Sequence, residues 1–235
     1  MVLNVVKYSP MVKQRTQPLA STKSRQRRTR ERAETRQRIL DAAREMFVRH
    51  GYEATTMRAI ADRIEYTATA IYHHFRNKDE LMMELATTDF RALAAAFQRI
   101  GQIEDPLERL RRVGEAYVDF ALEHPMQYQL MFMTPHPLMN VKGITRGDPS
   151  QDAYAFLRQV AAGVIASGRL RPEFQDPEEL AQMCWASLHG LLALHIIKHN
   201  PKQDGADWIA WRDARTTAAR MSEALLRGLL RGAGQ

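Results

Sequence analysis

Three Asp-Pro dipeptides constrain the fold of this chain more than any other feature of its sequence. They are Asp105-Pro106 followed by Glu108, Asp148-Pro149 followed by Gln151, and Asp176-Pro177 followed by Glu179. An aspartate at the N-cap, a proline in the first turn and an acid or amide at the third position are typical of a helix start. The second half of the chain is therefore predicted to consist of long helices, with Gly168 and Asn200-Pro201 as stops.

The first third of the chain is predicted to be helical as well. Apolar residues from Ile39 to Phe47 follow a helical period, which a glycine C-cap at Gly51 closes. Further signals are threonine caps at Thr56 and Thr67 and a capping box of Asn77 with Glu80, which opens a long helix ending near Gly101. No alternating pattern with hairpin turns competes. The predicted fold class is all-α, with about nine helices.

Basic charge is concentrated in one short segment. Residues 1–32 hold nine Lys or Arg and one acid, a net charge of +8, whereas the whole chain carries +7. Few apolar residues and mutual repulsion predict that this arm is disordered when free. A solvated tail is the plain interpretation. A segment that binds phosphates is favoured only where a DNA-binding element follows it.

Composition limits the compartment and the class of protein. The single cysteine, Cys184, cannot form an internal disulfide, and no run of eighteen apolar residues indicates a membrane span. A cytoplasmic protein without a membrane partner is expected. The sequence holds no nucleophile motif, no phosphate-binding glycine loop and no His-Glu-x-x-His, so no enzyme is predicted and no cofactor is expected.

The two short helices with threonine caps, Thr56 to Ile64 and Thr67 to Phe75, predict a helix-turn-helix. The preceding helix would pack across them through Ile39 and Phe47, giving a three-helix unit. The second short helix of such a unit lies in the major groove of double-stranded DNA. Residues 33–80 are therefore predicted to form a DNA-binding domain.

Residues 34–85 resemble the DNA-binding domain of the TetR family of transcriptional regulators. The resemblance rests on Ala42-Ala43-x-x-x-Phe47, Gly51-Tyr52, Thr55-Thr56, Ile60-Ala61, Ile71-Tyr72-x-x-Phe75 and Lys78-x-x-Leu81. Later in the chain, Trp185, His189 and Gly190 resemble a Trp-x-x-x-His-Gly signature of some family members. Two positions depart from the family, which usually has glycine where this chain has Glu65 and Thr69. The difference at Glu65 bears on the geometry of the turn, and the difference at Thr69 bears on which operator sequence is recognised.

The resemblance implies roles for single residues. Thr56, Tyr72 and Lys78 match positions that hold phosphates, and His74 matches one that braces the backbone side. The residues implied to face the groove are Thr67, Ala68, Thr69 and His73. Arginines of the arm, namely Arg25, Arg27, Arg28 and Arg30, are candidates for contacts to the minor groove or the flanking phosphates.

The remainder, residues 81–235, is predicted to bind a ligand and to dimerise. Its candidate ligand-binding residues are mostly aromatic: Phe97, Tyr117, Phe120, Tyr128, Met131, Phe132, Tyr154, Trp185 and His189. Such residues are more often core than pocket when taken singly, but as a set they suit a site for an apolar or planar molecule. The stretch from Thr134 to Asp148 would be a loop over that site.

The last two predicted helices, residues 177–200 and 206–231, are expected to form a four-helix bundle in a homodimer. The candidate interface residues are Leu191, Leu194, Trp211, Ser222, Leu226 and Leu229. The alternative is that the last helix only covers its own domain. A dimer is favoured because one recognition helix reads too few base pairs for specific binding.

The sequence predicts a ligand-responsive transcriptional regulator, most plainly a repressor that a small apolar or aromatic effector releases from a palindromic operator. The alternative is a metal-responsive regulator, because His195 and His199 have the spacing of metal ligands on one helical face. Two histidines near a helix end, where the macrodipole favours them, are the plainer interpretation. No metal site is predicted, and His73-His74 cannot share an ion, since adjacent side chains on a helix diverge.

Overall fold

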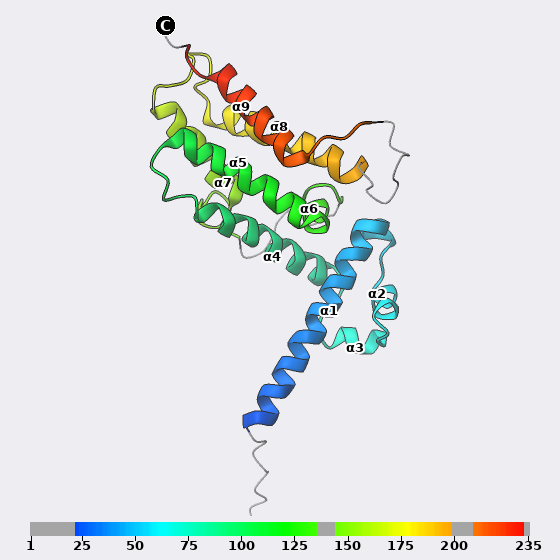
Figure 1. Cartoon of the computed structure of the whole chain (residues 1–235). Helices are drawn as coiled ribbons and strands as arrows, with labels where there is room; N and C mark the ends of the chain where they lie inside the picture. Colours follow the sequence, from blue (N-terminus) through cyan, green and yellow to red (C-terminus); the bar gives the residue numbers. More distant parts are fainter. Residues whose placement is uncertain (1–21, 136–143, 199–208, 233–235) are drawn as a thin grey trace, which may run out of the picture. The chain divides into compact units, whose positions relative to one another are not determined.

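The chain folds into nine α-helices within the residues that the structure, a computed structural model, describes: 22–135, 144–198 and 209–232. The helices are α1 (Thr22–Ala54), α2 (Met57–Arg63), α3 (Ala68–Tyr72), α4 (Lys78–Gln98), α5 (Pro106–Glu123), α6 (Pro125–Phe132), α7 (Ala153–Ala166), α8 (Pro177–Lys198) and α9 (Ala214–Leu229) (Figure 1). Apart from one isolated bridge, these ranges hold no β-structure. The all-α prediction is confirmed.

The chain divides into two compact units, residues 1–37 and 38–235. In the first unit α1 already begins at Thr22, so the prediction of a disordered arm is wrong for residues 22–32, while residues 1–21 lie outside the described part. The reason is local. Salt bridges between side chains one turn apart stabilise a helix, and neither Gly nor Pro interrupts the chain between residues 22 and 50.

In the second unit, the end of α1 packs with α2 and α3 around a small apolar core. Ile39, Phe47, Ile60 and Ile71 have no exposed surface, and Phe75 is 1% exposed. The packing predicted for Ile39 and Phe47 and the three-helix unit with its helix-turn-helix are confirmed. The core extends to the start of α4 and to Leu130 of α6.

Helices α4 to α9 enclose a second, larger core, with α5 against α7, α8 and α9. Within the described ranges, α8 is the one helix long and apolar enough to cross a membrane by length and composition, with a mean hydropathy of 1.4. The apolar composition of α8 is also explained by packing within the domain, because α8 contacts three other helices and lines a cavity.

Most of the predicted helix starts are confirmed. Thr56, Thr67 and Asn77 each accept a hydrogen bond from the backbone N–H three residues later, and Asp105 accepts one from Leu107. The backbone also leaves the helical region at Gly51 (φ 79°) and Gly168 (φ 70°), as expected for glycines that end a helix. The predicted stop at Asn200-Pro201 lies outside the described residues.

The predicted start at Asp148 is wrong. Helix α7 begins four residues later, because the Asp152 carboxylate accepts hydrogen bonds from the N–H groups of Tyr154 (3.0 Å) and Ala155 (3.2 Å). Asp148 instead accepts one from the backbone N–H of Ser150 at 2.9 Å. The Asp-Pro pair therefore makes a turn, and the second aspartate caps the helix.

Candidate functional site

The turn between α2 and α3 is a Schellman motif with glutamate in its left-handed position. The Tyr66 N–H donates to Ala61 O at 2.9 Å, and the Glu65 N–H donates to Asp62 O at 3.3 Å. Glu65 has φ 59°, the one positive φ at a non-glycine residue in the described ranges. Glycine is preferred there because it has no Cβ. The chain thus keeps the turn of the helix-turn-helix at an energetic cost.

Helix α3 presents a polar surface on a buried anchor. Ile71 is completely buried, while Thr67, Thr69, Tyr72 and His73 are exposed. Tyr72 is 54% exposed, a high value for an aromatic side chain. The hydroxyls and imidazole on this face can donate hydrogen bonds to phosphates and base edges.

Lys78, at the start of α4, is held against the end of α1. Its ammonium donates to Tyr52 O at 2.8 Å and to Glu53 O at 3.4 Å, and it lies 4.2 Å from the centre of the Tyr52 ring. The Tyr52 hydroxyl in turn donates to Asp79, and burial together with this carboxylate raises the tyrosine pKa. Lys78 therefore stabilises the fold, whatever else it contacts.

An apolar cavity of about 280 Å³ lies among α4, α5, α6, α7, α8 and α9. Aromatic and aliphatic side chains make up most of its wall, including Phe90, Phe97, Leu110, Val113, Tyr117, Phe132, Tyr154, Leu157, Trp185, Leu188, Leu225 and Leu226. Gly114 leaves room on α5, because a Cβ there would approach Leu188 Cδ1 to 3.2 Å. A space of this size accommodates a small apolar molecule.

Polar groups in and behind the cavity wall satisfy one another. Trp185 Nε1 donates to the Tyr117 hydroxyl (2.9 Å), which donates to the Tyr128 hydroxyl (3.0 Å). That hydroxyl lies 2.6 Å from His189 Nδ1. Burial raises the pKa of Tyr117 to about 12, raises that of Tyr128 and lowers that of His189, so the phenols stay protonated and the neutral imidazole accepts. The Trp185 and Tyr117 donors in the wall are therefore already occupied.

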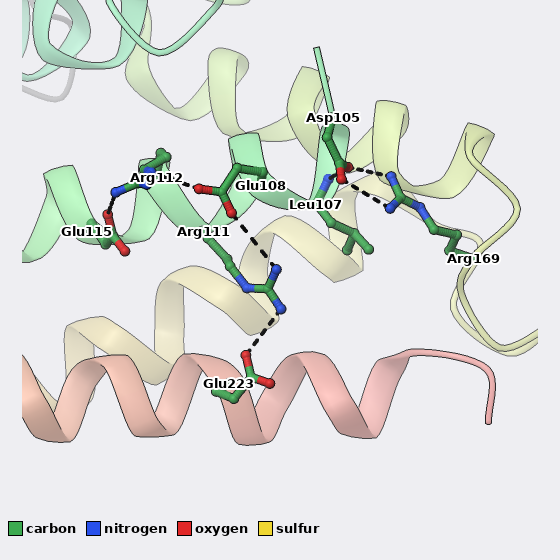
Figure 2. Close-up of polar contacts among 8 residues, drawn as sticks. All are labelled: Asp105, Leu107, Glu108, Arg111, Arg112, Glu115, Arg169 and Glu223. Atoms are coloured by element: carbon green, nitrogen blue, oxygen red, sulfur yellow. Dashed lines mark hydrogen bonds and ion pairs between the residues drawn. The ribbon is translucent and has the colours of Figure 1, made fainter. Parts of the chain in front are cut away.

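Arg111 of α5 brings a positive charge to the edge of the cavity. Its guanidinium donates to Glu223 of α9 at 3.1 Å and lies 4.0 Å from Glu108, as Figure 2 shows. Two carboxylates offset this cation, so it does not mark a strong site for an anionic ligand.

Two family models match this chain. The one described as bacterial regulatory proteins, tetR family, covers residues 39–85, and the tetracyclin repressor-like C-terminal domain covers residues 110–212. The chain belongs to the TetR family. The first model spans the helix-turn-helix, and the second spans most of the helices that enclose the cavity.

Curated relatives match this TetR-family protein over its N-terminal part. A helix-turn-helix transcriptional repressor of Mycobacterium tuberculosis is 42% identical over 71 residues, which is 30% of this chain and 38% of the relative. The repressor AcnR of Corynebacterium diphtheriae is 38% identical over 69 residues, 29% of this chain and 36% of the relative. The chain thus matches less than half the length of these relatives, and the likeness supports a DNA-binding transcriptional regulator.

Solved structures match the fold over most of its length. The ketosteroid regulator KstR2 of Mycobacterium tuberculosis superposes with a TM-score of 0.62 at 23% identity, over 84% of this chain and 96% of its own. The fatty acid degradation regulator FadR of Bacillus halodurans gives 0.62 at 16% identity, over 83% and 97%. At these identities only the shared fold follows.

The candidate DNA-binding residues differ in how accessible they are. Besides the exposed residues of α3, Thr56 is an exposed cap, whereas Ala68 and His74 are half-buried. In the first unit, Arg27 and Arg30 form salt bridges of 2.7 Å with Glu31 and Glu34, whereas Arg28 has no such partner among the described residues.

Five of the nine candidate ligand-binding residues line the cavity: Phe97, Tyr117, Phe132, Tyr154 and Trp185. Tyr128 and His189 lie behind the wall, in contact with Tyr117. Phe120 and Met131, both 7% exposed, are core residues that do not line the cavity, and their role in ligand binding stays a prediction. Leu110, Val113 and Gly114 also line the cavity, but a search for aromatic residues does not identify them. Their spacing of three and four residues along the helix that carries Tyr117 could have indicated that they share its face.

The candidate dimerisation residues separate into two groups. Leu226 and Leu229 are 3% and 1% exposed within a single chain, and Ser222 lines the cavity. Leu226 and Leu229 are therefore buried within their own domain, contrary to the prediction of an interface between chains, while for the half-buried Ser222 that prediction stays untested. Leu194 is 57% exposed, Leu191 is half-buried, and Trp211 packs edge-on against His195.

The metal-binding alternative finds no support. In the described ranges no group of three His, Cys, Asp or Glu side chains could hold an ion. His195 lies 5.8 Å from the Trp211 ring, centre to centre, and His199 lies outside those ranges.

Proposed function

We propose that this protein is a ligand-responsive transcriptional repressor that binds a palindromic operator as a homodimer. In this proposal residues 33–80 form the DNA-binding domain, and residues 81–235 bind the effector and the second subunit. The observation that carries the DNA-binding part is the exposed polar face of α3 above a fully buried Ile71. The similar relatives include repressors, although one, FasR of Mycolicibacterium smegmatis, is named an activator.

The effector is a small, largely apolar or aromatic molecule that occupies the cavity. Support comes from its lining, in which aromatic side chains predominate, and from the hydrogen-bond chain that ends at His189. A ligand rich in hydroxyl groups would find few free partners there, and each unpaired buried group would reduce its affinity.

Helix α6 is suited to carry the signal from the cavity to the DNA-binding domain. Its Phe132 lines the cavity, its Leu130 belongs to the core of the helix-turn-helix, and its Gln127 donates to Asp89 of α4 at 3.1 Å. A ligand that displaces Phe132 would move all three. The ligand then shifts the equilibrium between orientations of the recognition helices and releases the operator.

The test selects DNA from a random-sequence library with the purified protein and then compares variants by fluorescence anisotropy. Tyr72→Phe removes one donor from the exposed face and should weaken binding without lowering the melting temperature. Lys78→Ala should lower the melting temperature as well, because Lys78 caps the end of α1. No enrichment of a sequence by the wild-type protein would refute the proposal.

The effector is tested separately by thermal-shift screening of apolar, aromatic and polar compounds. A compound that stabilises the wild type should also reduce its affinity for the selected DNA. Trp185→Ala, which removes a wall residue, should lose the response and keep the affinity for DNA. Tyr72→Phe is the matched control, since it should keep the thermal shift.

A further inference from the structure

The N-terminal helical extension carries two chemically different faces. Arg27 and Arg30 donate to Glu31 and Glu34 at 2.7 Å, so that face is internally neutralised. Arg25, Arg28 and Arg32 are spaced three and four residues apart, and therefore share another face. All three are exposed, and no acidic partner is recorded for any of them in the described part of the chain. These three residues are called the arginine stripe.

The arginine stripe is unfavourable for the helix on its own. Like charges three and four residues apart repel one another and weaken the helix that brings them together. Arg25 and Arg32 have no acid three or four residues away, and Glu31, three residues after Arg28, pairs with Arg27 instead. An anionic partner along this face would remove the repulsion.

We infer that the arginine stripe is a docking surface for the phosphate backbone of duplex DNA next to the operator. The inference rests on the proposed function, which brings DNA to the same chain, and α1 itself continues into the core of the helix-turn-helix. Seven residues of helix extend about 10 Å. Duplex DNA carries about six phosphate charges over that length of its axis.

Arginine guanidinium groups match phosphate geometry through paired donors. Contacts to phosphates do not read sequence, so the stripe contributes affinity and dependence on salt, while α3 determines selectivity. This differs from the expectation of a flexible arm, because the helix selects which arginines face DNA. Arg28 belongs to the stripe, whereas Arg27 and Arg30 do not.

Two triple variants of the full chain test the inference. The first replaces Arg25, Arg28 and Arg32 by Gln. The second replaces Lys23, Arg27 and Arg30, which are spaced four and three apart on the other face, by Gln. Both lose three positive charges from the same helix, so long-range attraction falls equally and only the position differs. Circular dichroism checks that helical content is retained.

The probe is the duplex selected by the wild-type protein, with twelve flanking base pairs on each side or with none. The stripe variant should reduce the slope of log affinity against log salt by roughly 0.9 per lost phosphate contact. The effect should vanish on the duplex without flanks, and the control variant should keep the wild-type slope on both duplexes, although its affinity falls with the lost charge. Selectivity over a scrambled duplex should be the same for all three proteins.

Equal slopes for the two variants on the flanked duplex would overturn the inference. So would loss of binding to phosphatidylglycerol vesicles in the stripe variant with unchanged DNA binding, which would identify a membrane surface as the partner. Failure of the proposed function looks different, since the wild-type protein itself would then not distinguish the selected duplex from the scrambled one.

Discussion

Arg44 of α1 donates two hydrogen bonds to Asp89 of α4, and the aspartate has no exposed surface. The Arg44 side chain is 12% exposed, and its second guanidinium nitrogen lies 3.0 Å from Asp89 Oδ1. Gln127 of α6 donates to the same oxygen at 3.1 Å. One carboxylate therefore joins a helix of the DNA-binding unit to two helices of the larger bundle.

Breaking this pair from one side should destabilise the protein strongly. Burial raises the pKa of Asp89, and the hydrogen bonds from Arg44 and Gln127 oppose that shift. Asp89→Asn would leave Arg44 buried opposite a neutral amide, and the free energy of unfolding should fall by about 3–5 kcal/mol. Urea denaturation measures it.

The double variant Arg44→Met with Asp89→Leu should be far less affected than the sum of its single variants, because it leaves no unpaired charge. Glu45→Gln is the control, since Glu45 pairs with the exposed Arg63 and should contribute less than about 1 kcal/mol. Additive effects in the Arg44–Asp89 cycle would show that the two residues are not coupled.

Glu65→Gly should stabilise the protein. A side chain in the left-handed region costs about 1–2 kcal/mol, whereas the extra freedom of glycine in the unfolded chain costs about 0.5–1 kcal/mol. The melting temperature should therefore rise by a few degrees. Glu65→Ala keeps the Cβ and should match the wild type, which separates strain from loss of charge. A lower melting temperature for the glycine variant would mean that Glu65 makes a compensating contact.

The sequence predicts the helices because their ends are set by local chemistry. Thr56, Thr67, Asn77 and Asp105 each satisfy backbone N–H groups within three residues, so the signal and its effect lie in the same short stretch. The same reasoning misplaces the start of α7. Asp148 and Asp152 are both good caps, and only the final hydrogen bonds decide between them.

The sites depend on packing between helices, which sequence spacing does not reveal. An apolar stripe on α9 fits a subunit interface and a domain core equally well, and Leu226 and Leu229 belong to the core. Aromatic content correctly indicates a cavity, but it does not separate the wall residue Phe132 from the buried Met131 next to it. To predict the helix at residues 22–32, the salt bridge between Arg27 and Glu31 would have to be weighed against the high net positive charge of this segment.

Arg169→Gln should raise the pKa of Asp105. In the wild type, hydrogen bonds from Arg169 and from the Leu107 N–H hold this pKa at about 2 (Figure 2). The unfolded value is about 3.9, so Asp105 favours the folded state above pH ~4, and this contribution is lost as pH falls through about 2. Carboxyl NMR titration should show the variant closer to the unfolded value, though still lowered by the N-cap bond.

Arg112→Gln is the control for that titration. Arg112 pairs with Glu108 and Glu115 on the same helix and does not contact Asp105, so its loss should leave the Asp105 pKa near 2. If Arg169→Gln also leaves it there, the N-cap hydrogen bond alone is responsible for the low value.

Helix α8 offers a surface on which a second copy can dock. Leu194 and Ile197 are 57% and 58% exposed, two of the four large hydrophobic side chains that stand out in the described ranges. They lie three residues apart on the helix that packs beside α9, as a four-helix interface between subunits requires. Burial of such residues against a twofold-related copy would remove apolar surface from water.

Leu194→Glu combined with Ile197→Glu should therefore give a folded monomer, because charge enters the interface and not the core. Leu229→Glu should behave differently: at 1% exposure it buries an unpaired charge within its own chain, and the cooperative thermal transition should be lost. Analytical ultracentrifugation measures the first outcome and circular dichroism the second, with Gln102→Glu in an exposed loop as control for added charge. An intact dimer of the Leu194 and Ile197 variant would place the interface elsewhere. A monomeric variant that still selects operator DNA with wild-type affinity would instead separate dimerisation from specific binding.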